Sequence, residues 1–472
     1  MARPRGWLPT RQHILARCYT SLSLNQCREP RLQRPIGERA LVAAQAVPPS
    51  TSTVSIPSRL LCNKLSLAPL YSTHVARSLT STQLISLHLA LRSAATEESQ
   101  LDANGRARGT TPRDFFHPFT QSLPTRFDSL PLTWELAASS FKLCDRFEID
   151  ASDKTPSGPS QNLSIDLLSC LAPSLSVRTD DVINRFEVDW KRCRAVWDDH
   201  LGTHPEETDR LRFQAFHIAW CNVNTRCLYY DLGLPQTDNL TLCPIIDMIN
   251  HRSSRTTLPQ GSSSSLSFSS PPATSTTEDA YRQGDEFIFS YGAHDNALLM
   301  AEYGFSLGPN NLENNNLDLS SYVEQLVLDD PHGSAKRDLL EAEGYWRGWT
   351  IQVEPNSDEA SYPSFRTLVA LRLLHIERLD RGSAALQSWQ DVISGLLDVV
   401  SARNEAKVEQ TLLHIASRVE DECAQVLKRC QNLMLKYVRL ENDDAMTAKH
   451  CLTMLKGIAE SDRSIASRLR FG

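Results

Sequence analysis

The chain has 472 residues, a formal net charge of −7 and 41% hydrophobic residues, a globular composition with room for two or three domains. No apolar run approaches the roughly 18 residues that a membrane-spanning helix needs, and the acidic balance argues against a strongly basic nucleic-acid-binding protein. The 12 cysteines include no C-x-x-C pair, so we expect reduced, core-filling thiols rather than a zinc or redox motif.

Residues 1–36 are predicted to form a basic leader that is disordered or serves in targeting. Residues 1–40 contain eight arginines, no lysine and only two acids. This bias is typical of a mitochondrial transit sequence, and a disordered basic tail is the alternative. We expect the protein in the cytoplasm, the nucleus or both, and a functional transit sequence would instead place it in the mitochondrion.

Short strands are predicted at 40–47 and 53–57, separated by a turn at Pro48-Pro49-Ser50. From about 78 to 235 the apolar residues recur every three or four positions, which predicts a helical insert. Its longest helices are expected near 180–199 and 212–230. The chain therefore changes from predicted strands to predicted helices, and a further strand is predicted after the helical insert.

An apolar run at 243–249 ends in the pair Asn250-His251. Residues 286–291 alternate in a way that predicts a strand. Its aromatic residues share one face: Phe287, Phe289 and Tyr291. Taken alone, the Asn-His pair is typical of an Asx turn, and an aromatic stripe is typical of a core. The two segments become informative only together.

The segment between these motifs, 253–277, consists mostly of Ser, Thr and Pro. Such a run has few apolar groups to offset its loss of conformational entropy, so a mobile surface loop is predicted. Beyond Pro309 the chain becomes acidic and helical. Helices are predicted at 365–377 and 389–400, with a long amphipathic helix over 412–437. An intramolecular bundle is favoured over a dimeric coiled coil, and a monomer is expected.

Three motifs carry a resemblance to a known family. They are Asp247-x-x-Asn250-His251, the strand ending in Ser290-Tyr291-Gly292, and Glu302-Tyr303-Gly304-Phe305. Together they resemble the cofactor and catalytic segments of SET-domain methyltransferases, in the branch of the Rubisco large-subunit and fungal ribosomal-protein lysine methyltransferases. The resemblance implies an α+β fold: a SET core of small β-sheets with a threaded crossing and helical insert over 37–310, then an all-α substrate-docking domain over 311–472.

The resemblance also implies a function and a set of site residues. It implies S-adenosylmethionine as cofactor and N-methylation of a lysine in a protein, more plausibly a ribosomal or translation component than a histone. Tyr291 is implied as the catalytic residue. The implied cofactor contacts are Glu38, Arg39, Ala40, Asn250, His251 and Tyr291, and the implied substrate-side residues are Arg226, Asp247 and Tyr303. No metal, nucleic acid or membrane is expected at the site.

Several alternatives remain open from the residues themselves. Where the family shows Gly-x-Gly before Leu-Val-Ala, this chain has Glu38-Arg39-Ala40, which favours a catalytically inactive SET fold used for binding as one alternative. A protein-histidine methyltransferase is another. Arg226 and Asp247 are equally typical of a structural ion pair. Tyr303 is also typical of a packed helix residue, and Asn296 is expected to cap its helix.

Overall fold

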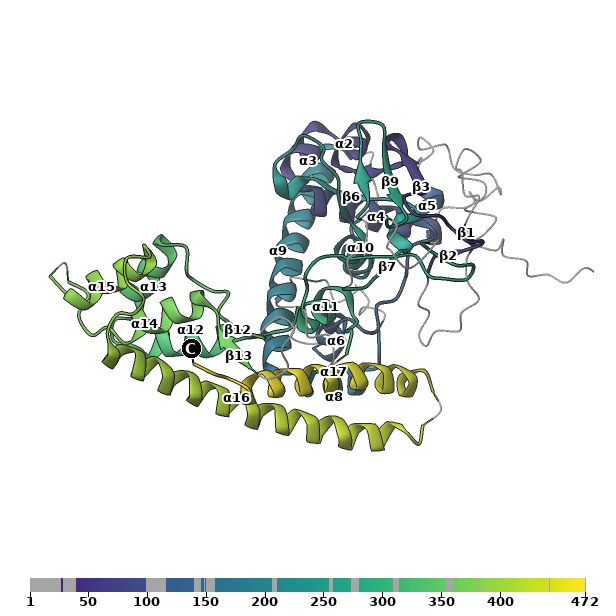
Figure 1. Cartoon of the computed structure of the whole chain (residues 1–472). Coiled ribbons are helices and arrows are strands. Elements are labelled where there is room, and N and C mark those ends of the chain that lie inside the picture. The colour runs from purple at the N-terminus through teal and green to yellow at the C-terminus, as the bar shows by residue number, and fades with distance from the viewer. Residues whose placement is uncertain are drawn as a thin grey trace, which may run out of the picture. The chain divides into compact units, whose positions relative to one another are not determined.

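The computed structural model describes residues 27–28, 40–98, 116–139, 146–147, 149, 158–205, 210–253, 258–272, 280–308, 314–353, 360–380, 382–440 and 442–471 (Figure 1). Most of the basic leader and two predicted cofactor residues, Glu38 and Arg39, lie outside these ranges. The chain divides into two compact units. The first comprises Met1–Asp128, Thr133–Gln161 and Ile183–Gly292, and the second Ser129–Leu132, Asn162–Val182 and Ala293–Gly472.

The described part of the first unit contains four small sheets. Antiparallel pairing joins β1 (Cys27–Arg28) to β2 (Val42–Ala43). A second antiparallel sheet has the strand order β3 (Ser52–Pro57), β9 (Ser265–Ser269), β8 (Gln260–Gly261). A third has the order β4 (Cys62–Asn63), β6 (Leu240–Leu242), β5 (Leu228–Tyr229). The fourth sheet pairs β7 (Asn250–His251) with β10 (Ile288–Phe289) in parallel.

Strand β9 corrects the prediction of a mobile loop at 253–277. Its sequence, Ser-Leu-Ser-Phe-Ser, alternates strictly, and Leu266 and Phe268 are buried. These side chains join the core of the first unit together with Val54 and Ile56 of β3, and Figure 1 shows the two strands side by side. The loop prediction is therefore wrong for this part of the segment, because two apolar residues at period two are enough to bury one face of a strand.

Helices form much of the rest of the first unit. They are α2 (Lys64–Leu67), α3 (Thr73–Ser78), α4 (Ser81–Glu98), α5 (His117–Thr120), α10 (Phe213–Arg226), most of α6 (Pro131–Ala138) and most of α9 (Pro173–Thr203), with 3-10 turns at Ser58–Leu60, Ala68–Leu70, Gln236–Asp238 and Ile246–Met248. Aromatic rings join α9 to α10. Phe186 lies 5.7 Å from Phe213 and 5.4 Å from Trp220, centroid to centroid. Such contacts stabilise the helices beyond the burial of their area.

The second unit is mainly helical. It contains most of α8 (Gln161–Leu168), α11 (Asn296–Tyr303), α12 (Ser320–Asp329), α13 (Gly333–Ala342), α14 (Phe365–Leu374), α15 (Ala384–Ile393), α16 (Ala402–Tyr437) and α17 (Asp443–Ser467). The predicted helical C-terminal region is confirmed, but it is not all-α. An antiparallel sheet of β11 (Asn316–Asp318), β12 (Thr350–Val353) and β13 (Ser361–Pro363) lies within it. The helix predicted at 389–400 ends at Ile393, just before Gly395 with φ 72°.

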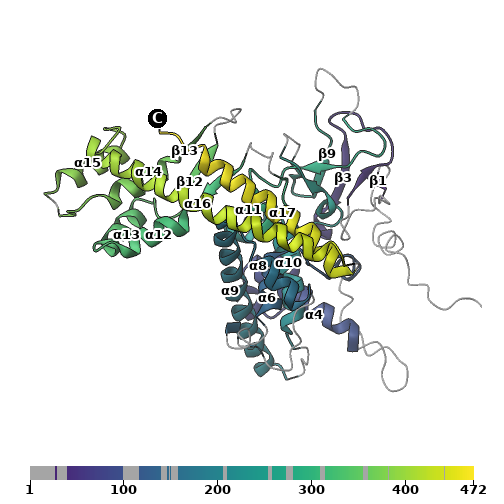
Figure 2. The same cartoon turned by 90° about the horizontal axis from the view of Figure 1, so that it is seen from below.

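The long helix α16 packs against α17 of the same chain, as Figures 1 and 2 show. The side chains of Ser401 and Asn442 cap the two helices by accepting hydrogen bonds from the backbone N–H groups of Asn404 and Ala445. The buried residues of α16 recur every three or four positions, with Leu412, Val419 and Cys423 in the core of the unit. The predicted intramolecular packing is therefore present.

The cap of helix α11 differs from the prediction. Asp295, not Asn296, is the N-cap, and its side chain accepts a hydrogen bond from Leu298 N at 2.7 Å. The Asn296 side chain instead donates to Gly308 O at 2.7 Å and accepts from Leu307 N at 2.9 Å. Asn296 thus ties the chain beyond the helix back to its start, while the shorter acidic side chain before it satisfies the free N–H groups.

A carboxylate lies buried among the elements of the second unit. Asp462 of α17 accepts hydrogen bonds from Ser174 Oγ at 2.6 Å and from Ser174 N at 3.3 Å. Burial raises the pKa of Asp462 to about 7, and the nearby carboxylates of Asp295 and Asp318 also raise it. Arg178 lies 3.8 Å and 3.4 Å from those two carboxylates. The folded unit therefore disfavours the charged form of Asp462.

The raised pKa of Asp462 predicts a pH-dependent gain in stability for Asp462→Asn. A carboxyl whose pKa rises from 3.8 to about 7 on folding lowers the free energy of unfolding as the pH rises between these values, and the full cost is present above pH 7. We expect the variant's gain over wild type to be larger at pH 8 than at pH 5, by on the order of 2 kcal/mol in urea unfolding. Glu460→Gln, at a partly exposed position on α17, is the control. Equal gains at both pH values would contradict the assignment.

Candidate active site

The Asn250-His251 pair and the strand that leads to Tyr291 lie side by side in the first unit. Strands β7 and β10 pair in parallel, with Asn250 opposite Ile288 and His251 opposite Phe289. The pairing continues where Arg252 N donates to Phe289 O at 3.3 Å. Segments about forty residues apart in the sequence therefore form one local structure. Tyr291 follows two residues after the end of β10.

A strained turn precedes β7. Ile245 has φ 72° and ψ −51°, and Ile246 N donates to Pro244 O at 2.8 Å, which closes a γ-turn. This conformation is unfavourable for a β-branched residue and costs about 1–3 kcal/mol. The Ile245 side chain is buried in the core of the unit, so packing offsets the strain. The turn sets the direction in which the chain enters the Asn250-His251 pair.

Tyr291 is held at both ends by the segment that contains this pair. Its backbone N–H donates to His251 Nδ1 at 3.0 Å, and its hydroxyl donates to Ile249 O at 2.9 Å. The Tyr291 ring lies 5.1 Å from the His251 ring and 5.2 Å from that of Phe289, centroid to centroid. Because His251 Nδ1 accepts a hydrogen bond, it carries no proton. Because the phenol donates to Ile249, its oxygen keeps lone pairs for accepting other hydrogen bonds.

Residues 40–43 join the same structure. Phe287 N donates to Leu41 O at 2.9 Å, and Ala43 N donates to Asp285 O at 2.8 Å. Ala40, a predicted cofactor residue, is buried directly before this pairing. The predicted cofactor residues that the structure describes thus come from three segments. The 285–291 segment contains Tyr291, pairs with β7 and bonds to the residues that follow Ala40.

Asn250 has a hydrogen-bond partner that is not among the predicted site residues. Its Nδ2 donates to Glu286 Oε1 at 2.7 Å. Alternation along the strand places Glu286 on the face opposite Phe287, a signal available in the sequence. Nothing in the sequence pattern indicates that this face meets Asn250. The contributions of Ile249 O and of the His251 ring to holding Tyr291 were also missed.

The proposed substrate-side residues Arg226 and Asp247 form an ion pair. Arg226 Nη1 donates to Asp247 O at 2.9 Å and lies 3.3 Å from Asp247 Oδ2. The Asp247 side chain is 2% exposed and that of Arg226 is 21% exposed. The structural alternative for this pair is therefore observed, since it ties the end of α10 to the turn before β7. A substrate role for either residue remains a prediction.

Tyr303 belongs to the second unit, where it is the last residue of α11. Its ring lies 6.2 Å from each of His294 and Phe305, centroid to centroid, and it is partly buried. Gly304 ends the helix with φ 77°, and a Cβ there would lie 2.6 Å from Ser129 Oγ, so glycine is required. The role of Tyr303 toward a substrate remains a prediction.

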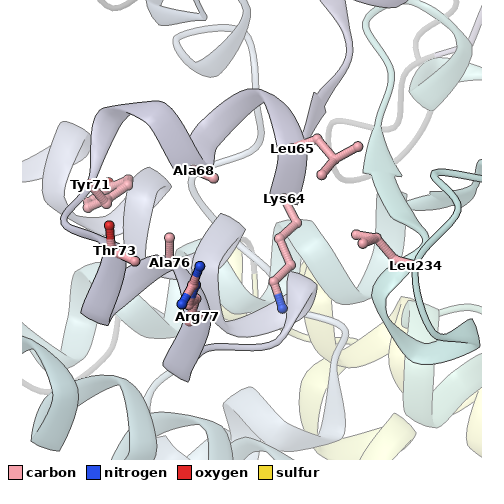
Figure 3. A pocket seen from close by; sticks show the side chains of 8 residues that line it. All are labelled: Lys64, Leu65, Ala68, Tyr71, Thr73, Ala76, Arg77 and Leu234. Atoms are coloured by element: carbon pink, nitrogen blue, oxygen red, sulfur yellow. The ribbon is translucent and has the colours of Figure 1, made fainter.

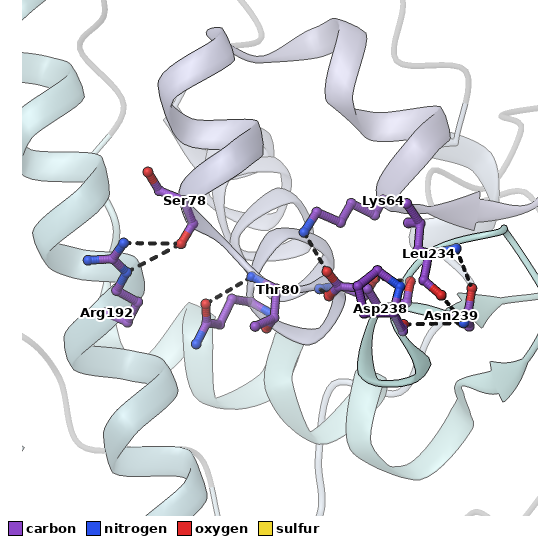
Figure 4. Close-up of polar contacts among 10 residues, drawn as sticks. Lys64, Ser78, Thr80, Arg192, Leu234, Asp238 and Asn239 are labelled. Atoms are coloured by element: carbon purple, nitrogen blue, oxygen red, sulfur yellow. Dashed lines mark hydrogen bonds and ion pairs between the residues drawn. The ribbon is translucent and has the colours of Figure 1, made fainter.

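A hollow of about 250 Å³ lies elsewhere in the first unit, lined by the residues in Figure 3, among them Lys64, Arg77 and Leu234. None of the predicted site residues lines it. Lys64 Nζ donates to Asp238 Oδ2 at 2.7 Å, and Asn239 Nδ2 donates to Leu234 O at 2.9 Å (Figure 4). These bonds hold the loop that carries Leu234 in place, and we assign the hollow no role in catalysis.

In the described part of the chain, no three His, Cys, Asp or Glu side chains cluster as metal ligands. His217 is a buried core residue that shares a hydrogen bond with Thr133 Oγ1 at 3.2 Å. Burial lowers the pKa of His217 to about 4, so it is neutral at physiological pH.

Among the described helices, none has the length and apolar character of a bilayer span.

Comparison with solved structures identifies the fold. The chain matches the SET domain of LSMT bound to lysine and AdoHcy with a TM-score of 0.59, over 97% of this chain and 90% of that one, at 15% identity. It matches Rubisco LSMT bound to sinefungin and monomethyllysine with a TM-score of 0.58, over 98% and 92%, at 16% identity. The fold is that of a SET-domain protein. The predicted α+β SET fold with a helical C-terminal region is confirmed.

Sequence comparison agrees with the SET fold. Ribosomal lysine N-methyltransferase set11 of Schizosaccharomyces pombe is 29% identical over 223 residues, which are 45% of this chain and 51% of that protein. Ribosomal lysine N-methyltransferase 2 of Saccharomyces cerevisiae is 29% identical over 44% and 45% of the two chains, and human SET domain-containing protein 4 is 26% identical over 63% and 62%. The alignments span about half the length of the two yeast relatives. No family model matches the chain.

The ion pair predicts a loss of stability for Arg226→Ala. Removal of the guanidinium leaves a buried carboxylate without that cation, which lowers the free energy of unfolding by roughly 3 kcal/mol. Urea unfolding measures the effect. We expect the double variant Arg226→Ala/Asp247→Asn to recover much of the loss, because the buried charge is gone. If Arg226→Ala unfolds like wild type, the pair does not hold these segments together.

Proposed function

We propose that this chain is an S-adenosylmethionine-dependent methyltransferase that modifies the side-chain nitrogen of a lysine in a protein. The observation that carries the proposal is that strand pairing and hydrogen bonds bring Asn250, His251 and Tyr291 together. Two yeast relatives are named ribosomal lysine N-methyltransferases, and SET-fold neighbours were solved with AdoHcy and lysine or with AdoMet. These names support the proposed class of reaction.

The groups around β7 suit the cofactor chemically. S-adenosylmethionine, when bound, supplies a methyl group on a positively charged sulfur, together with an amino-acid tail and an adenine ring. The Asn250 amide offers both donor and acceptor atoms, as an ammonium and a carboxylate require. We assign Asn250 to the amino-acid tail, the His251 backbone to the adenine, and the segment at Ala40 to a further backbone contact.

Tyr291 is proposed as the catalytic residue. Its hydroxyl proton is committed to Ile249 O, so the phenol oxygen faces the reacting groups only as an acceptor. An acceptor at this position can orient a lysine amine and stabilise positive charge beside it. The two bonds to His251 and Ile249 fix the phenol, and such fixed positioning can supply much of the rate of a direct displacement.

The substrate must present an uncharged amine, because a protonated amine has no lone pair for attack. A free lysine has a pKa near 10.4, so the site must favour loss of its proton. We propose a ribosomal or translation protein as substrate, supported by the names of the two yeast relatives. Arg226, Asp247 and Tyr303 are retained as proposed substrate-side residues.

Methylation by this chain is expected to depend on the Tyr291 hydroxyl. Purified protein incubated with labelled cofactor and a lysate of its own cells should label one or a few proteins. Tyr291→Phe should reduce this rate by at least about 100-fold, because an acceptor and the bond to Ile249 are both lost. Tyr229→Phe, at an exposed phenol in the same unit, is the matched control and should retain full activity.

Two results would count against this proposal in different ways. Full activity in Tyr291→Phe would mean that the catalytic group lies elsewhere. No heat of binding with millimolar S-adenosylmethionine in isothermal titration would instead indicate a SET fold without enzymatic function.

The modified residue is expected to be a lysine. Tandem mass spectrometry of the labelled protein should locate mass increments of one to three methyl groups on lysine side chains. Replacement of the identified lysine by arginine in the substrate should abolish labelling. Methylation found on a histidine would overturn the lysine assignment while leaving the methyltransferase activity in place.

A further inference from the structure

Glu286 fixes the orientation of the Asn250 amide. Its Oε1 accepts a hydrogen bond from Asn250 Nδ2 at 2.7 Å. An ionised carboxylate can only accept hydrogen bonds, so the amide must turn its nitrogen toward Glu286. The carbonyl oxygen of the amide then points to the other side. A bond to a charged acceptor of this length is among the stronger hydrogen bonds in proteins.

Backbone pairing on both sides of Glu286 fixes the position of its main chain. Val42 forms a β-bridge with Glu286, and the flanking bonds, Ala43 N to Asp285 O and Phe287 N to Leu41 O, set the register. Phe287 is fully buried in the core of the first unit. A shift by one residue would expose this ring and bury the carboxylate, so the register is strongly fixed.

Glu286 therefore connects two of the proposed cofactor segments. Its backbone pairs with the strand that follows Ala40, and its side chain holds Asn250 on β7. Two residues later the chain enters β10, which pairs with β7 and leads to Tyr291. The Glu286 side chain contacts the Asn250 amide and lies on the face opposite the buried Phe287 ring.

We propose that Glu286 is a positioning residue for cofactor binding, which presents the carbonyl oxygen of Asn250 to the ammonium group of the amino-acid tail. This inference rests on the proposed function. An ammonium group can only donate hydrogen bonds. If the amide were turned the other way, its NH2 group, also a donor, would face the ammonium group and no hydrogen bond could form. Glu286 acts through Asn250 and needs no contact of its own with the cofactor.

Isothermal titration with S-adenosylhomocysteine tests the proposal, because this ligand carries the same amino-acid tail and is not consumed. Glu286→Ala should raise the Kd about 10-fold, as expected for the loss of a charged hydrogen bond. Glu286→Gln should stay within about threefold of wild type, because a Gln carbonyl still accepts from Asn250 Nδ2. Asp285→Ala, which removes the adjacent exposed acid, is the matched control and should bind like wild type.

A double-mutant cycle separates positioning from a general effect on folding. In the Asn250→Ala background, Glu286→Ala should have no further effect on the Kd, and saturating cofactor should restore kcat in Glu286→Ala alone. The inference is overturned if Glu286→Ala binds like wild type, or if Glu286→Gln loses as much affinity as Glu286→Ala. A wild-type protein that binds no S-adenosylhomocysteine would refute the proposed function instead.

Discussion

The parallel pairing of β7 with β10 is the constraint on which the candidate active site depends. The strands are only two residues long, yet they bring Asn250-His251 next to the strand that ends before Tyr291. Side-chain bonds extend this pairing beyond its two ladder positions, through His251 Nδ1 and Ile249 O. So short a pair is not stable alone, and its geometry is supported by the buried residues beneath it.

The same core explains how a strained turn is tolerated beside the site. Ile245 adopts a positive φ and contributes its side chain to the cluster that contains Phe287 and Phe289. Backbone strain of this kind persists only where the surroundings over-determine the conformation. The aromatic stripe is core at Phe287 and Phe289, whereas Tyr291, the proposed catalytic residue, is only partly buried. One segment therefore contributes to the core and leads to the proposed site.

Long helices and the two motifs could be predicted because their signals are local and repeated. Helix α16 shows many apolar positions at helical spacing, whereas β9 offers only Leu266 and Phe268 among serines, so composition hid its alternation. The cap of α11 was misplaced by one residue, because Asp295 and Asn296 are both good caps and only the bonds of Asn296 to Leu307 and Gly308 distinguish them. Glu286 could not be found, because its partner is set by tertiary structure.

The pairing of β3 with β9 has a consequence for the synthesis of the protein. Ser55 and Ser267, which meet across this pair, are 212 residues apart. In the described sheet β3 is an edge strand whose neighbour is β9, so on the ribosome it remains without that neighbour until the serine-rich segment has emerged. Closure of so large a loop is slow, and until it closes the unpaired edge of β3 can associate with other chains. Translation of the intervening helices thus sets a lower limit on the time before the first unit can fold, and chaperone cover during that interval would be of benefit.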